Sequence, residues 1–148
     1  MPIPNFDEQG LLPEGIHDCT WAELADRFCR FQSNDCRPEL CRRLQEMVEA
    51  LRRSKMIREI LIDGSFATSK PQPNDIDLIL VLPSDWDFAS ELSPDTYNLM
   101  SKNRVRKRFG FDIFVAREKS LEYETDVDFL QQVRDQPGAR KGFLRIRP

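Results

Sequence analysis

Three aspartates stand in or beside stretches of the sequence that otherwise favour apolar strands. Asp75 and Asp77 are two residues apart at the start of the apolar run Ile76–Leu82, so their side chains share one face, with Cα atoms about 6.5–7 Å apart. Asp112 is the one charged residue in the stretch 109–115 (FGFDIFV). Like charges on a buried strand are costly unless a cation lies between them, and Mg²⁺ or Mn²⁺ favours carboxylate oxygens.

These three carboxylates can converge if the two strands that carry them are neighbours in a sheet. Asp112 would then lie about 5 Å across from one of the other two aspartates. Three carboxylates suffice to hold two divalent cations about 3.5–4 Å apart, an arrangement that binds both the attacking and the leaving oxygen of a phosphoryl transfer. The sequence therefore predicts that Asp75, Asp77 and Asp112 form a catalytic and metal-binding set.

A second feature with chemical potential is the Gly64-Ser65 pair, which ends an earlier apolar strand. Glycine lets the backbone approach a ligand closely. Backbone N–H groups and the Ser65 hydroxyl at the start of a helical turn suit phosphate oxygens. Lys70 lies in the same loop and can add a point charge for a triphosphate, so Gly64, Ser65 and Lys70 are predicted to bind a nucleotide.

Each of these residues also has a purely structural interpretation. Asp75 can cap a turn, Asp112 can be a strand charge that faces solvent, and Gly64-Ser65 can be an ordinary turn. The site is absent only if all three structural interpretations hold together. The combined pattern is far more specific than any one part of it: a strand, Gly-Ser, Asp-Ile-Asp, a helix, and a strand that contains Asp. The basic run Lys102–Arg108 either complements the negative end of a helix or helps to bind a triphosphate or RNA.

The elements that must position these residues follow from hydrophobic periodicity and capping signals. Thr20 and Glu23 have the spacing of a capping box at a helix start. Helices are expected over about 20–31, from 33–35 to 55, over 93–107 and over 126–134, and strands over 57–62, 76–82, 109–115 and 142–147. We expect residues 1–148 to form one α/β (α+β) domain, with a mixed central sheet, flanking helices and an extended N-terminal arm over 1–19.

Composition limits the possible partners and compartments. The formal net charge of −3 disfavours non-specific binding to duplex DNA, although a local basic patch can still bind nucleotides or RNA ends. No apolar run approaches the ~18 residues that a membrane span needs. The N-terminus lacks the pattern of a secretory signal, so a cytoplasmic location is expected.

The four cysteines all lie between residues 19 and 41. No two of them form a C-x-x-C pair, and with His17 their spacing fits no zinc knuckle or ribbon. We therefore expect Cys19, Cys29, Cys36 and Cys41 to be reduced, partly buried thiols.

The segments GSFATSKPQPNDIDLILV and FGFDIFV together resemble the polymerase-β-like nucleotidyltransferase superfamily, whose pattern is hG[GS], then Dh[DE]h, then h[DE]h. The match is nearest to small bacterial nucleotidyltransferase-like proteins of the minimal type. The segments LLPEGIHDCTWAELADRF and RKGFLRI also look like those chains. One departure is that Thr68-Ser69 stands where such proteins usually have an Arg-Gly pair.

The resemblance implies a nucleotidyltransferase fold and a Mg²⁺-dependent (or Mn²⁺-dependent) enzyme. It would move a nucleoside monophosphate from a nucleoside triphosphate, ATP among the candidates, to a hydroxyl of a protein or RNA acceptor and release pyrophosphate. Gly64 and Ser65 would hold the phosphates, Asp75 and Asp77 would bind both metals, and Asp112 would bind one metal and help to deprotonate the acceptor. By analogy, a toxin–antitoxin or phage-defence role is possible. The alternative is a binding or regulatory subunit with this fold and weak or no turnover.

Overall fold

The computed structural model describes residues 3–29, 36–70, 73, 76–89, 91–133 and 138–148. Helices and strands alternate along these segments, and the strands form one mixed sheet in the order β1-β5-β2-β3-β4. The strands are β1 (Ile16–Asp18), β2 (Glu59–Asp63), β3 (Asp77–Leu82), β4 (Asp112–Arg117) and β5 (Phe143–Ile146). The helices are α1 (Trp21–Phe28), α2 (Cys36–Ser54), the 3₁₀ turn η1 (Ser65–Ala67), α3 (Pro94–Met100), α4 (Lys102–Phe109) and α5 (Leu121–Gln131).

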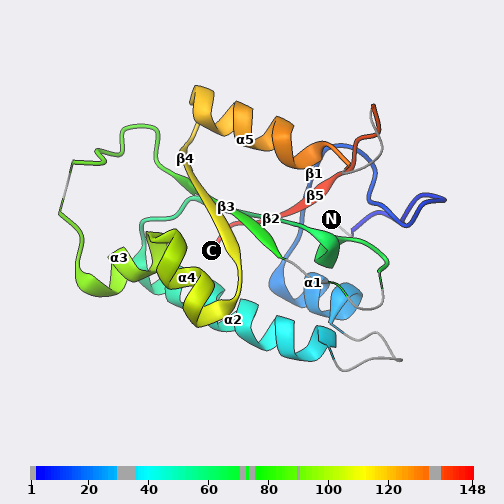
Figure 1. Ribbon diagram of the computed structural model, residues 1–148, viewed down its shortest axis with the longest axis horizontal. Coiled ribbons are helices and arrows are strands. Elements are labelled where there is room, and N and C mark those ends of the chain that lie inside the picture. The colour runs from blue at the N-terminus through cyan, green and yellow to red at the C-terminus, as the bar shows by residue number, and fades with distance from the viewer. Residues whose placement is uncertain (1–2, 30–35, 71–72, 74–75, 90, 134–137) are drawn as a thin grey trace.

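Helices cover both faces of the sheet, as predicted for an α/β domain. In Figure 1, α5 lies on one face, and α1 and α2 lie on the other. The larger core lies on the second face, where side chains such as Leu44, Leu78 and Leu80 pack together. The smaller core, which includes Leu61 and Ile79, lies between the sheet and α5. Alternate residues of one strand thus face different cores, and both faces of the central strands are apolar, as the run 76–82 predicts.

Local signals place most of the helices where the sequence indicates. The Thr20 hydroxyl accepts from the Glu23 N–H, and the Glu23 carboxylate accepts from the Thr20 N–H, which confirms the predicted capping box. The single helix expected over 93–107 is instead two helices, because Ser101 ends α3 and its hydroxyl accepts from the N–H of Arg104 to begin α4. The last helix is also earlier than predicted, since Ser120 caps a helix over Leu121–Gln131 rather than 126–134.

The N-terminal arm contains a strand that was not predicted. Within the arm over 1–19, β1 pairs in parallel with β5, from Ile16 opposite Phe143 to Asp18 opposite Arg145. Ion pairs between Arg145 and Asp18 reinforce this edge. A three-residue strand at a sheet edge depends on its partner strand, so its own sequence carries little periodic signal.

The expectation of four reduced cysteines is wrong. Cys29 and Cys41 form a disulfide that joins the end of α1 to α2, while Cys19 and Cys36 keep their thiols outside any disulfide. Their spacing of 12 residues matches no short motif. The two thiols meet because α1 and α2 contribute to the same core, which is a tertiary property.

Arg37 connects α2 to the loop that follows η1. Its side chain is fully buried on the apolar stripe of α2, and its guanidinium lies 5.2 Å from the ring centre of Phe66. It donates to the backbone carbonyl oxygens of Phe66, Thr68 and Lys70 at 2.8 Å each, and to that of Phe28 at 3.1 Å. Burial lowers the pKa of this guanidinium to about 10, so it remains charged at neutral pH.

Replacing Arg37 should destabilise the protein far more than replacing another arginine of the same helix. Arg37→Met leaves several carbonyl oxygens without their donor, so we expect the free energy of unfolding to fall by about 3 kcal/mol or more. Arg42→Met is the matched control, because Arg42 is exposed and pairs with Glu39 and Glu46 on the helix surface. Urea unfolding of the three proteins measures the difference, and equal effects of both substitutions would contradict this role of Arg37.

Candidate functional site

Three aspartates lie side by side on the neighbouring strands β2, β3 and β4, all at the same end of these strands. In β2 and β3, which are antiparallel, Asp63 lies opposite Asp77. In β3 and β4, which are parallel, Asp77 lies opposite Asp112. Residues that are opposite each other on neighbouring strands point to the same face, and strands are about 4.8 Å apart. We call Asp63, Asp77 and Asp112 the aspartate row; it lies on the face that α5 covers, since Leu61 and Ile79 belong to that core.

The structure therefore brings Asp77 and Asp112 together as the sequence predicts, although the setting of Asp112 differs. It is the first residue of β4, whereas the sequence indicated a strand over 109–115 with Asp112 at its middle. Its side chain is exposed, as the alternative of a strand charge that faces solvent describes. The strand begins later than predicted because α4 continues to Phe109 and ends at Gly110, which has a left-handed φ of 81°. Gly110 thus turns the chain so that β4 begins beside β3.

The carboxylates become more buried along the row from β4 to β2. Asp112 is exposed, Asp77 is half-buried and Asp63 is only 1% exposed. A cation lies beside each end of the row. Arg106 of α4 forms an ion pair with Asp112, and the Nζ of Lys141 lies 3.3 Å from Oδ1 of Asp63. The two end carboxylates are thereby compensated by side chains from outside the three strands.

Asp63 is the carboxylate whose acidity changes most. Burial raises its pKa from 3.8 to about 7, against the opposing effects of Lys141 and of the Gly64 N–H, while the charge of Asp77 raises it further. Its Oδ1 faces Lys141 without a well-oriented hydrogen bond. The raised pKa of Asp63 means that full ionisation of all three carboxylates is unfavourable, as expected for carboxylates that share one face.

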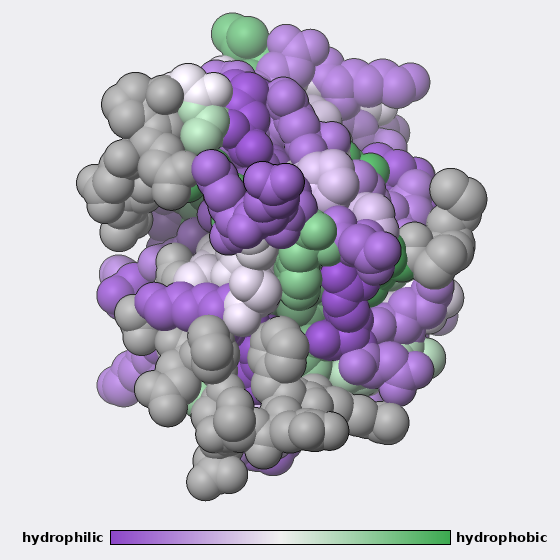
Figure 2. Space-filling model, turned by 90° about the vertical axis from the view of Figure 1, so that its right-hand side faces the viewer, coloured by the Kyte–Doolittle hydropathy of each residue, from purple (hydrophilic) through white to green (hydrophobic). Residues whose placement is uncertain are grey.

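The Gly64-Ser65 turn begins directly after Asp63 and so lies at the same end of the sheet. Gly64 has φ 88° and ψ −177°, a conformation that is accessible to glycine and strained for other residues. Ser65 begins η1, and its carbonyl oxygen accepts from the Thr68 hydroxyl at 2.6 Å. Lys70 is exposed, and its backbone bonds to Thr68 and Arg37. Where its residues are coloured, the face drawn in Figure 2 is mostly hydrophilic, with a narrow hydrophobic strip.

Asp75, the third predicted ligand, lies outside the described residues. Within the described segments, no group of three or more His, Cys, Asp or Glu side chains lies close enough to hold a metal ion. The sequence-based metal set of Asp75, Asp77 and Asp112 therefore stays a prediction, with two of its members placed in register.

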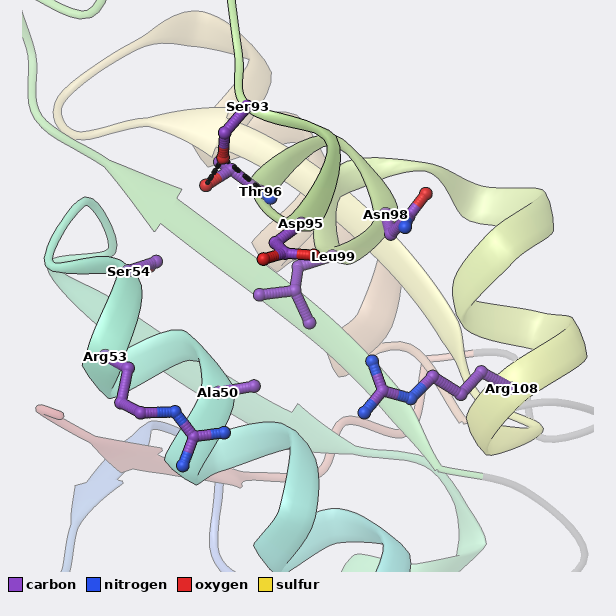
Figure 3. Close-up of a pocket in the computed structure, with 9 residues that line it drawn as sticks. All are labelled: Ala50, Arg53, Ser54, Ser93, Asp95, Thr96, Asn98, Leu99 and Arg108. Atoms are coloured by element: carbon purple, nitrogen blue, oxygen red, sulfur yellow. Dashed lines mark hydrogen bonds between the residues drawn. The ribbon is translucent and has the colours of Figure 1, made fainter.

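A polar cavity of about 480 Å³ lies elsewhere, between α2, α3 and α4. Figure 3 shows Arg53 and Arg108 on opposite sides of it, with Asp95 and Leu99 between them. These helices pack on the opposite face of the sheet from the aspartate row, because Leu99 and Val105 belong to the larger core. The cavity is thus separate from the predicted site.

Sequence reasoning missed two residues at the aspartate row, Asp63 and Lys141. The signal for Asp63 was present, because it is a charge at the end of the apolar run 60–62. Lys141 carried no such signal, since a lysine in a loop before a strand is common. Its role depends on the pairing of β5 with β2, which brings the two distant segments together.

Comparison with known protein families identifies a match over nearly the whole chain. The model of "Family of unknown function (DUF6932)" matches residues 4–147, nearly the whole chain, so the protein belongs to this family. No curated protein matches the chain, and no solved structure does. In the part of the chain that the structure describes, no helix is long and apolar enough to cross a membrane.

The raised pKa of Asp63 predicts a particular dependence of stability on pH. Because the folded protein holds this proton more tightly than the unfolded chain, the contribution of Asp63 is complete below about pH 4 and is lost as the pH rises to about 7. Relative to Asp63→Asn, the wild-type free energy of unfolding should therefore fall across this window, by at most about 4 kcal/mol.

Urea unfolding in metal-free buffer at several pH values measures this difference. Asp85→Asn, an exposed aspartate beyond the other end of β3, is the control and should follow the wild-type curve. If the wild type and Asp63→Asn keep a constant difference between pH 4 and pH 7, Asp63 ionises as an ordinary surface aspartate.

Proposed function

We propose that this protein is a nucleotidyltransferase of the polymerase-β-like superfamily. One observation carries the proposal: Asp77 and Asp112 occupy opposed positions of neighbouring parallel strands, at the sheet end where the Gly64-Ser65 turn begins. The chain order of these residues matches the superfamily pattern, and the mixed five-stranded sheet with helices on both faces is compatible with such a fold.

The donor set fits a hard divalent cation. Asp77 and Asp112 offer carboxylate oxygens on one face, and Asp75, two residues before Asp77, is proposed as a further ligand. A bound Mg²⁺ or Mn²⁺ would neutralise charge that develops on the transferred phosphoryl group and lower the pKa of the acceptor hydroxyl. The half-buried Asp77 lies between two other aspartates, and a bound cation would offset the repulsion among these like charges.

The proposed reaction transfers a nucleoside monophosphate. An acceptor hydroxyl oxygen attacks the α-phosphorus, the bond between that phosphorus and the α,β-bridging oxygen breaks, and pyrophosphate leaves. Asp112, which is exposed and so open to an acceptor, takes part in removing the hydroxyl proton. The backbone N–H groups and hydroxyl at Gly64-Ser65 hold the phosphates, and Lys70 adds positive charge from the same loop.

The acceptor is proposed to be a hydroxyl of a partner protein or of an RNA, and a toxin–antitoxin or phage-defence role rests on analogy alone. A second candidate function is a binding or regulatory subunit of this fold with little turnover. The Arg106–Asp112 ion pair favours it, because a guanidinium bound to Asp112 competes with a metal for that carboxylate. The two candidates differ in whether nucleotide is consumed.

Metal binding at the row can be measured without turnover. Mg²⁺ or Mn²⁺ should raise the melting temperature of the wild type, because an ion that binds only the folded state stabilises it. The same ion should do little for the double variant Asp75→Asn, Asp77→Asn. An equal shift in both proteins would place the metal elsewhere.

Turnover separates the enzyme from the binding subunit. Asp77→Asn keeps the size of the side chain and removes a charge, so activity should fall by several orders of magnitude while the fold survives. Pyrophosphate release and transfer of label from each α-labelled nucleoside triphosphate to a cell extract measure activity, and Asp85→Asn is the charge-matched control. If wild type and Asp77→Asn release pyrophosphate equally slowly, the binding subunit is the better description.

A further inference from the structure

The most buried ion pair at the candidate site, between Asp63 and Lys141, takes no part in the reaction proposed above. Asp63 and Lys141 have side chains that are 2% and 16% exposed, and their charged atoms are 3.3 Å apart. A buried ion pair is weak as a stabilising device, because the cost of removing two charges from water roughly cancels their attraction. Its position at one end of the aspartate row therefore suggests a use beyond stability.

The backbone holds Lys141 in place from two sides. Its own N–H donates to the carbonyl oxygen of Gln131 at the end of α5, at 2.8 Å, and the next residue, Gly142, donates to the carbonyl oxygen of Leu12 at 3.0 Å. A Cβ at Gly142 would lie 1.9 Å from the carbonyl oxygen of Pro13, so the arm passes against this point without space for a side chain. These backbone contacts thus fix the position from which the Lys141 side chain extends.

Asp63 holds the Lys141 ammonium close to the start of the Gly64-Ser65 turn. The Asp63 carboxylate accepts from the Gly64 N–H and faces Lys141, so the ammonium and the first N–H of the turn lie around one carboxylate. An ammonium has three donors. Among the described residues Asp63 is the one ion-pair partner of Lys141, which leaves donors for another anion.

We propose that Lys141 is a phosphate-binding residue of the nucleotide site, and that Asp63 is the residue that positions it. The inference rests on the proposed function and names the part of the substrate involved: the terminal phosphates of a nucleoside triphosphate, which are also the atoms of the pyrophosphate product. These phosphates would lie over the Gly64-Ser65 turn, with Lys141 on the β5 side and Asp77 on the β3 side.

Binding of inorganic pyrophosphate with Mg²⁺, measured by calorimetry, tests the proposal without turnover. Lys141→Met should weaken the affinity for pyrophosphate at least tenfold, because a charge-assisted hydrogen bond is lost. Lys119→Gln is the control, an exposed lysine at the far end of β4, and should bind as the wild type does. ATP in place of pyrophosphate shows whether the intact nucleotide uses the same contact.

Because Lys141→Met leaves Asp63 buried without its partner, a double variant separates folding from binding. Asp63→Asn with Lys141→Met removes both charges and should recover melting temperature relative to Lys141→Met alone, yet its affinity should stay at least tenfold weaker than that of the wild type. If the double variant recovers affinity together with melting temperature, or if Lys141→Met binds as the wild type does, the pair is structural and the proposal is wrong. A wild type that binds neither ligand overturns the proposed function itself.

Discussion

The register around β3 is the constraint on which the candidate site depends. Because side chains alternate along a strand, a shift of β3 by one residue against either neighbour would send Asp77 to the other face of the sheet. The register is fixed by the two cores, since Leu78 and Leu80 must face α2 while Ile79 and Val81 must face α5. The row of aspartates is thus a by-product of hydrophobic packing further along the same strands.

Three carboxylates can lie on one face because solvent, ion pairs and a raised pKa reduce the repulsion between them. Asp112 is exposed to solvent and paired with Arg106, while Asp63 is buried beside Lys141 and has a raised pKa. Asp77, in the middle, is bordered by carboxylates at both neighbouring positions. The proposed metal ligand set includes Asp77 because its carboxylate lies between the other two along the row.

Much of the fold could be predicted from the sequence, because its signals are local. The capping box at Thr20 and the apolar run 76–82 depend on residues close in the chain. The features that the sequence did not predict depend on contacts between separate segments. They are the short strand β1, the Cys29–Cys41 disulfide and the ion pair between Asp63 and Lys141. From the sequence, Asp77 and Asp112 could be predicted to lie close together only if their strands were neighbours in the sheet. In the structure, β3 and β4 are neighbours and the two aspartates lie opposite each other.

Arg37 helps to hold the segment that leads from the Gly64-Ser65 turn toward β3. Within its described part, carbonyl oxygens of Phe66, Thr68 and Lys70 converge on one guanidinium, in addition to the β-bridge between Thr68 and Leu11. A core of apolar side chains alone could not shape this segment, because it cannot satisfy backbone carbonyls. The same side chain therefore gives this segment its shape, because it joins three of its carbonyl oxygens to α2.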